Sequence, residues 1–224
     1  CDGFDASDQM NRYCNWWQHG YMSSTGECFD IGMTVSDALA RYLEVKNPFA
    51  GSVDPFSAGN GSLMRLAPIV LFYGHDKDLL LKYAAESSRT THGAAECIDA
   101  CRYFATVLRV ALFAETKLEV IKSNLYSPET EKVKAIASGG YVNKLMGGIK
   151  GSGYVIESLE AALWCFANTD SYDEAVLLAA NLGDDADTTA AICGQVAGAY
   201  YGIKGIRESW LEKLVMREEL MELS

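Results

Sequence analysis

Gly183-Asp184-Asp185-Ala186-Asp187-Thr188-Thr189-Ala190 is the stretch that says most about this chain, because three carboxylates and two hydroxyls stand directly before a run of small residues. Carboxylates held close together raise one another's pKa unless protons, a helix N-terminus or a metal ion compensates their charge. Asp185 and Asp187 are two positions apart and do not share one face of a regular helix. From a loop entering a first turn they can converge on one ion, with the Thr188 hydroxyl as a third oxygen. All-oxygen ligation favours Mg2+ or Mn2+ over Zn2+.

Helix capping is the competing interpretation of the same acids. Asp and Thr are favoured at helix N-termini, where a single carboxylate needs no ion. Three acids exceed what a cap requires, so the pattern favours a metal site. The segment that follows carries Ala190, Gly194 and Gly198 at four-residue spacing. A helix face made of these small residues predicts a central, buried helix that other helices approach closely. The acidic cluster would then lie in a cleft at the N-terminus of that helix.

The composition is that of an acidic protein with enough apolar residues for a full core. The chain has 224 residues, of which 49% are hydrophobic, and a formal net charge of -11. No break in composition separates domains, so we expect one domain over residues 1–224. The negative charge, without a basic stripe interleaved with aromatic residues, argues against nucleic acid as a partner. No stretch is long and apolar enough to suggest a membrane span.

The cysteines predict a reducing compartment. There are seven of them, an odd number, and they lack both CxxC spacing and histidine partners at zinc intervals. They are typical of free thiols, which indicates a cytoplasmic protein. The N-terminus shows no secretory signal pattern.

Helical periodicity dominates the chain, and no alternating strand pattern of useful length occurs. Glycines concentrate between the periodic segments, where loops are expected. The pattern predicts an all-α protein with functional loops. The expected helices cover residues 36–45, 77–88, 96–113, 154–166, 173–182 and 189–201.

Four further segments carry candidate site residues. The glycine-rich turn at 57–65 offers backbone amides to an anion such as diphosphate, although a tight turn with a Ser cap explains it equally well. The loop at 147–155 ends in Tyr154, whose ring can stack on a flat ligand or belong to the core. Asp30 stands among apolar residues as a helix cap or a catalytic carboxylate. His92 is expected at the end of a helix, where a structural role is the simpler interpretation.

Taken together, these segments resemble the ADP-ribosylglycohydrolase family, the group that contains the dinitrogenase reductase activating glycohydrolase. Residues 183–188 are similar to the family's C-terminal metal motif, usually Gly-Gly-Asp-x-Asp-Thr, and the continuation through Gly202 also matches. The resemblance covers nearly the whole chain. The other matching segments, in the family's order, are residues 29–32, 59–65, 91–93 and 151–155.

The resemblance implies a compact multi-helix fold with a binuclear Mg2+ or Mn2+ centre in a cleft. It implies metal-dependent hydrolysis of the glycosidic bond that links ADP-ribose to a protein side chain, with ADP-ribosylarginine the first expectation. The partner would be an ADP-ribosylated protein or a small ADP-ribosyl conjugate. By similarity, the metal ligands are Asp185, Asp187 and Thr188; the acid beside the scissile ribose is Asp30; the diphosphate site is Asn60, Gly61 and Ser62; the adenosine end is Gly151, Ser152, Gly153 and Tyr154; and His92 lies close to the ligand.

Two features depart from the family pattern. Asp184 stands where the family usually has Gly, which adds charge beside the metals. The family also carries an earlier metal motif, Thr-Asp-Asp-Thr, and an upstream acidic ligand, and this chain has neither. Cys1-Asp2-Gly3-Phe4 resembles the stretch shortly after that motif. We therefore expect a domain that lacks its N-terminal helices and about half of the metal site, with weakened Mg2+ binding and exposed core side chains.

The sequence is also compatible with two functions other than that of a glycosidase. A catalytically inactive module of the same fold would keep an ADP-ribose pocket or a structural role without turnover. Metal-dependent hydrolysis of a phosphate ester would also use an oxygen-rich site, but the glycine loop and Tyr154 favour a nucleotide-shaped ligand.

Overall fold

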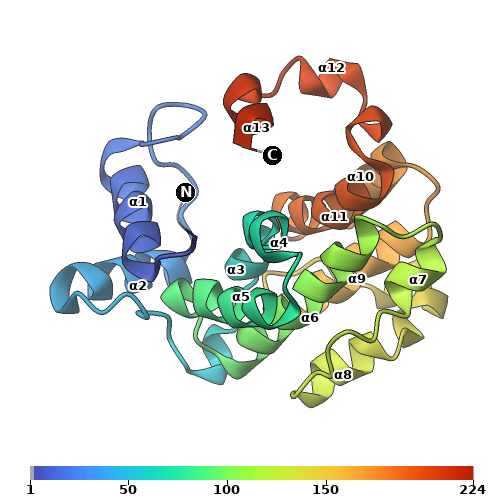
Figure 1. Ribbon diagram of the computed structural model, residues 1–224, viewed down its shortest axis with the longest axis horizontal. Helices are drawn as coiled ribbons and strands as arrows, with labels where there is room; N and C mark the ends of the chain where they lie inside the picture. Colours follow the sequence, from blue (N-terminus) through green and yellow to red (C-terminus); the bar gives the residue numbers. More distant parts are fainter. Residues whose placement is uncertain (1–2, 224) are drawn as a thin grey trace.

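The computed structural model describes residues 3–223, and within this range it is built from helices and loops (Figure 1). No β-strand occurs in the described range. The only extended pairings there are two isolated bridges, which join Ser52 to His92 and Gly59 to Tyr154. The prediction of an all-α protein is confirmed. Residues Cys1 and Asp2, which contributed to the resemblance at the N-terminus, lie outside the described range.

The chain forms a series of α-helices, and short 3-10 turns occur in the connections from α2 to α3, from α8 to α9 and from α11 to α12. Their bounds are α1 (Ala6–His19), α2 (Met33–Val45), α3 (Gly61–Met64), α4 (Ala67–Tyr73), α5 (Lys77–Thr91), α6 (Ala95–Ala111), α7 (Lys117–Ile121), α8 (Glu131–Ala137), α9 (Val155–Ala167), α10 (Tyr172–Asn181), α11 (Ala186–Tyr201), α12 (Glu208–Leu211) and α13 (Arg217–Leu223).

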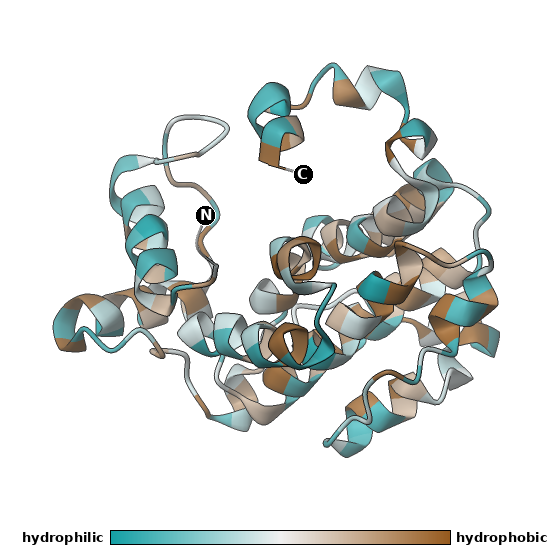
Figure 2. Ribbon diagram, in the orientation of Figure 1, coloured by the Kyte–Doolittle hydropathy of each residue, from teal (hydrophilic) through white to brown (hydrophobic). Residues whose placement is uncertain are grey.

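All six helices expected from periodicity are present, as α2, α5, α6, α9, α10 and α11. The pattern did not reveal α1, because this helix buries only Met10 and Cys14 and is largely hydrophilic (Figure 2). Its start is set locally, since Asp5 caps it by accepting a hydrogen bond from the Asp8 amide at 2.7 Å. Gly20 ends it in a left-handed conformation, with φ of 66°.

The centre of the main core is formed by α6 and α9. Ten of the thirteen residues of α9 are buried, and Tyr103, Phe104 and Phe166 are among the large side chains fully removed from solvent. A second, smaller cluster of Met10, Cys14, Leu39 and Tyr42 joins α1 to α2. These two helices form the lobe on the left of Figure 1, and they frame the loop that carries Asp30.

The expectation that α11 is a central, buried helix is confirmed in part. It buries five residues along one face, and Ala191 is exposed. The helix contacts α3, α6, α9 and α10. Its stripe of small residues faces α10 at Gly194, where an added Cβ would lie 3.3 Å from the Tyr172 hydroxyl oxygen. Several helices therefore pack around α11, although it is not enclosed on all sides.

Two expectations from composition concern the described residues. Every cysteine among them is a free thiol: Cys14, Cys28, Cys97, Cys101, Cys165 and Cys193. Within residues 3–223, no helix combines the length and the apolar character that a bilayer crossing requires.

The close packing at Gly194 gives a first prediction. Gly194→Val should lower the free energy of unfolding by about 1–3 kcal/mol, because its branched side chain enters space held by Tyr172. Ala191→Val, on the exposed side of the same helix, should cost less than about 1 kcal/mol, the loss in helix propensity. Chemical denaturation of both variants checks this; equal losses would show that Gly194 is not held tightly.

Candidate functional site

Three segments that are far apart in the sequence meet at the N-terminus of α11. The Asn60 side-chain amide donates a hydrogen bond to Asp185 Oδ2 at 2.7 Å. The Asn60 backbone N–H donates to the Gly153 carbonyl at 3.1 Å, and the Asp185 N–H donates to the Gly151 carbonyl at 2.8 Å. These bonds hold the turn before α3, the 151–153 loop and the acidic turn together. The structure therefore brings together residues from three of the predicted site segments.

Gly151 makes this meeting possible. A Cβ added at Gly151 would lie 3.2 Å from both the Gly183 carbonyl oxygen and the Thr189 hydroxyl oxygen, so a side chain would push the loop away from α11. The Thr189 hydroxyl is fully buried and has no hydrogen-bond partner among the described residues. At Gly153 there is slightly more room, since an added Cβ would be 3.6 Å from Asp185 Oδ2.

His92 supports the glycine turn from beneath. It directly follows α5, and only 2% of its surface is exposed. Its ring lies so close to the turn that a Cβ at Gly61 would be 3.0 Å from its Cε1, and one at Gly59 would be 3.3 Å from its Nε2. Burial, with a smaller contribution from the Arg65 charge, lowers the pKa of His92 to about 3. The imidazole is therefore neutral near pH 7.

Ser62 faces the protein interior. Its side chain is 1% exposed, and its hydroxyl accepts a hydrogen bond from the Ser88 hydroxyl at 2.9 Å. The Cys101 sulfur lies 3.5 Å away on the same side. A ligand above the glycine turn can therefore meet the backbone of Ser62, whereas its hydroxyl is already engaged in the core.

The acidic turn has an unusual backbone. Gly183 and Asp184 both have positive φ, 78° and 58°, and Asp185 then precedes the first residue of α11. This left-handed region favours glycine, which explains physically why the related motif usually has Gly at the position of Asp184. Asp tolerates the conformation better than most residues, so the substitution preserves the turn.

The oxygen atoms of this turn suit a hard divalent cation. Asp187 is exposed and Thr188 half-buried, and no Lys or Arg pairs with Asp184, Asp185 or Asp187 within the described part of the chain. Carboxylate and hydroxyl oxygens are ligands for Mg2+ or Mn2+. The set is incomplete, because residues 3–223 contain no group of three or more His, Cys, Asp or Glu side chains that would hold a metal.

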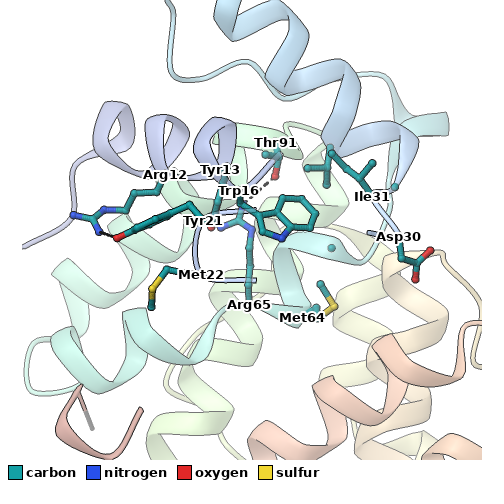
Figure 3. Close-up of a pocket in the computed structure, with 13 residues that line it drawn as sticks. Arg12, Tyr13, Trp16, Tyr21, Met22, Asp30, Ile31, Met64, Arg65 and Thr91 are labelled. Atoms are coloured by element: carbon teal, nitrogen blue, oxygen red, sulfur yellow. Dashed lines mark hydrogen bonds between the residues drawn. The ribbon is translucent and has the colours of Figure 1, made fainter. Parts of the chain in front are cut away.

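Asp30 lies on the other side of the glycine turn. Its φ is 51°, another left-handed conformation. Asp30 and Trp16 both line a cavity of about 460 Å3 (Figure 3), and Gly61 lines it as well. The segment that follows Asp30 runs beside the turn: a Cβ at Gly59 would be 3.7 Å from Thr34 Oγ1. Asp30 thus lies beside the glycine turn but does not join the hydrogen-bonded cluster of Asn60.

Tyr154 is held by two residues that sequence reasoning missed. Its hydroxyl donates to the Glu96 carboxylate and accepts from Lys132 Nζ at 2.6 Å, and Lys132 also lies 5.0 Å from the centre of the ring. Burial and the bond to Glu96 raise the pKa of Tyr154. The sequence patterns around Glu96 and Lys132 are those of ordinary helices and contain no signal that could have placed either residue beside Tyr154.

A second cavity, of about 530 Å3, lies beside Tyr154. It is lined by Gly59, Gly153 and Tyr154 on one side and by Phe56 on another. Phe56 is 98% exposed, which makes it a second candidate for stacking on a flat ligand. Pro55 begins the short 3-10 turn that presents this ring.

Comparison with known proteins agrees with this geometry. The sequence matches the ADP-ribosylglycohydrolase family over residues 1–224. It is 38% identical to ADP-ribosylarginine hydrolase Tri1 of Pseudomonas putida (strain GB-1), covering 99% of this chain and 59% of that protein. It is 28% identical to the ADP-ribosyl-[dinitrogen reductase] glycohydrolase of Rhodospirillum rubrum, covering 85% of this chain and 62% of that protein.

A solved structure supports the same assignment. The structure, described as an ADP-ribosylglycohydrolase-related protein complex, has a TM-score of 0.82 and 39% sequence identity, and the match covers 99% of this chain and 73% of that one. The chain belongs to the ADP-ribosylglycohydrolase family. It spans about 59% of the length of the first of the curated relatives described above.

The left-handed turn gives a second prediction. Asp184→Gly should leave the free energy of unfolding unchanged or raise it, because glycine adopts positive φ without steric cost. Asp184→Val should lower it by about 1–2 kcal/mol, the cost of a left-handed conformation for a residue with a Cβ. Urea denaturation of the two variants measures the difference, and a Val variant as stable as the Gly variant would contradict the backbone assignment.

His92 gives a prediction about pH. Folding lowers the pKa of His92 from its ordinary value of 6.5 to about 3, so the unfolded chain takes up a proton first as the pH falls. The contribution of neutral His92 to stability is complete above pH 6.5 and is lost between pH 6.5 and 3, by up to about 1.4 kcal/mol per pH unit.

The matched test compares His92→Gln with His75→Gln, since His75 is exposed. Between pH 7 and 4, unfolding free energies of the His92 variant should depend less steeply on pH than those of the native sequence, while the His75 variant should follow the native curve. Parallel curves for all three proteins would show that His92 is not held neutral.

Proposed function

We propose that the natural protein containing this chain hydrolyses the N-glycosidic bond between ADP-ribose and an arginine side chain of a protein, in a reaction that depends on Mg2+ or Mn2+. The observation that carries the proposal is the bond from Asn60 to Asp185 Oδ2, because it places the glycine turn directly against the oxygen-rich start of α11. The name of the Pseudomonas putida relative at 38% identity, an ADP-ribosylarginine hydrolase, supports arginine as the acceptor.

The residues around the glycine turn have the chemical order that ADP-ribose requires. Tyr154 and Phe56 line the cavity at one end, where the adenine ring would stack. The diphosphate would lie over residues 59–61 and the 151–153 loop, whose glycines allow a ligand close to the backbone. The terminal ribose would then lie between Asp185 and Asp30, which lines the cavity at the far end.

The reaction replaces the bond from the anomeric carbon to the guanidine nitrogen by a bond to water oxygen. Positive charge builds on the ribose as the guanidine leaves, and a carboxylate beside the ring stabilises that charge. Asp30 would accept a proton from the attacking water, and that proton would then pass to the departing guanidine nitrogen, which returns Asp30 to its carboxylate form. Asp185, Asp187 and Thr188 would hold the divalent ions, which supply positive charge for the ribose hydroxyls and the water.

The test is release of ADP-ribose from an ADP-ribosylated arginine protein, with Mn2+ and with a chelator. Asp187→Asn should lower kcat/KM by at least about 10–100-fold, since it removes a proposed ligand while keeping the size of the side chain. Asp184→Asn is the matched control: it removes a neighbouring exposed acid, and Asn also accepts left-handed φ. Its kcat/KM should stay within about twofold of the native value.

Three results separate the possibilities. Mn2+-dependent release that Asp187→Asn abolishes supports the proposal. Binding of ADP-ribose without any release would instead favour the inactive binding module. A native kcat/KM in the Asp187→Asn variant would reject the metal assignment, and failure to bind or cleave any ADP-ribosyl compound would reject the proposed ligand.

A further inference from the structure

Arg65 binds the C-terminal end of α5 without an acidic partner. Its guanidinium donates hydrogen bonds to the Ser87 hydroxyl and carbonyl oxygens, both at 3.0 Å, and to the Thr91 hydroxyl at 2.9 Å (Figure 3). Within residues 3–223, no carboxylate forms an ion pair with Arg65. The positive charge of Arg65 therefore acts on neutral groups, and the Thr91 hydroxyl is one of them.

The Thr91 hydroxyl links Arg65 to His92. Its oxygen lies 2.8 Å from His92 Nδ1, and Thr91 is fully buried. A guanidinium has donors only, so the Thr91 oxygen accepts from Arg65 and keeps its own hydrogen for another acceptor. In the described part of the chain, the Thr91 hydroxyl has no partner besides Arg65 and Nδ1. The Thr91 hydroxyl therefore donates to Nδ1.

This arrangement selects one tautomer of His92. A proton on Nδ1 would leave the hydroxyl hydrogen of Thr91 buried without an acceptor, which is unfavourable. The positive charge of Arg65, on the same side of the ring, also disfavours a proton there. Burial and the Arg65 charge lower the pKa of His92 to about 3, so the ring holds a single proton near pH 7. That proton is on Nε2.

His92 Nε2 lies where the two cavities meet. A Cβ added at Gly59 or at Gly61 would be 3.3 Å from Nε2, so side chains at these positions would cover it. Gly59 and Thr34 line the cavity of about 530 Å3, whereas Gly61 and Val35 line the cavity of about 460 Å3. A ligand that extends from one cavity into the other therefore passes Nε2.

The Nε2 donor is not used by the fold. Within residues 3–223 it has no hydrogen-bond partner, and it is not one of the unpaired polar atoms that are sealed from solvent there. Buried polar groups in proteins are generally paired, and unpaired ones call for an explanation. A free donor between two cavities is explained by an acceptor atom that a ligand brings.

We infer that Arg65 and Thr91 are positioning residues, which hold His92 as its Nε2–H tautomer so that the neutral ring donates a hydrogen bond to a phosphate oxygen of the ligand. The choice of a phosphate oxygen rests on the proposed function, in which the diphosphate lies between the two cavities. The tautomer rests on the contacts of Thr91 alone.

The first measurement is the tautomer in the natural protein, labelled with 15N-histidine and free of ligand. The His92 signals are those lost in His92→Gln. Near pH 7, Nε2 should give the resonance of a protonated nitrogen and Nδ1 that of an unprotonated one, far downfield. A protonated Nδ1 would overturn the inference. This result needs no variant of Arg65 or Thr91 to fold.

The second measurement removes the linking hydroxyl. In Thr91→Val the two nitrogen resonances should move toward each other, and KM for ADP-ribosylated arginine should rise about 3–10-fold, the effect of one weakened hydrogen bond. The value of kcat should stay within about twofold, because the diphosphate is remote from the scissile bond. Thr91→Ser should restore both properties.

Thr90→Val is the matched control for Thr91→Val. Thr90 is equally buried, and its hydroxyl also accepts from Arg65, at 3.3 Å, but it forms no hydrogen bond with His92. The Thr90 variant should keep the native tautomer and the native KM. A native tautomer or a native KM in Thr91→Val would overturn the positioning role.

The third measurement tests the donor. With Mg2+ present, ADP-ribose should shift the Nε2–H proton signal downfield, and adenosine, which has no phosphate, should not. ADP-ribose that binds without moving this signal would overturn the donor role and leave the proposed function intact. Failure to bind or cleave any ADP-ribosyl compound would reject the proposed function instead. Inorganic diphosphate is then the probe: a shifted Nε2–H signal supports the donor, and an unchanged signal overturns it.

Discussion

The hydrogen bond from the Asn60 amide to Asp185 Oδ2, 2.7 Å long, is the contact on which the arrangement of the site depends. It joins a turn in the first third of the chain to the helix that begins at Ala186. The 151–153 loop is held between them by backbone bonds at both of its ends. Because each of the three segments is a loop with no strand to fix it, this cluster sets their relative positions, while His92 fills the space beneath the turn.

The same contact creates an electrostatic requirement. It brings the carboxylate of Asp185 to a groove whose proposed ligand carries an anionic diphosphate, in a chain with a net charge of -11. The start of α11 already has three acids, and within the described residues no basic side chain pairs with them. An anion can be accommodated here only if positive charge is brought in, which is the physical reason for expecting divalent ions.

Periodicity was sufficient to predict the α-helical class and six of the helices, and the family resemblance grouped the segments that converge at Asp185. They were insufficient for residues whose role depends on distant partners. Glu96 and Lys132 contact Tyr154 from α6 and α8, and neither residue has a local signature. The small-residue stripe of α11 correctly indicated close packing, which occurs against α10 at Gly194, but it gave no sign that Ala191 on the same helix is exposed.

A crystal structure of the natural protein with ADP-ribose and Mn2+ tests the central claim most directly. The account predicts a diphosphate over residues 59–61, adenine against Tyr154, and the terminal ribose between Asp30 and an ion held by Asp185 and Asp187. ADP-ribose bound elsewhere, or bound in this groove with no ion at Asp185, would contradict it.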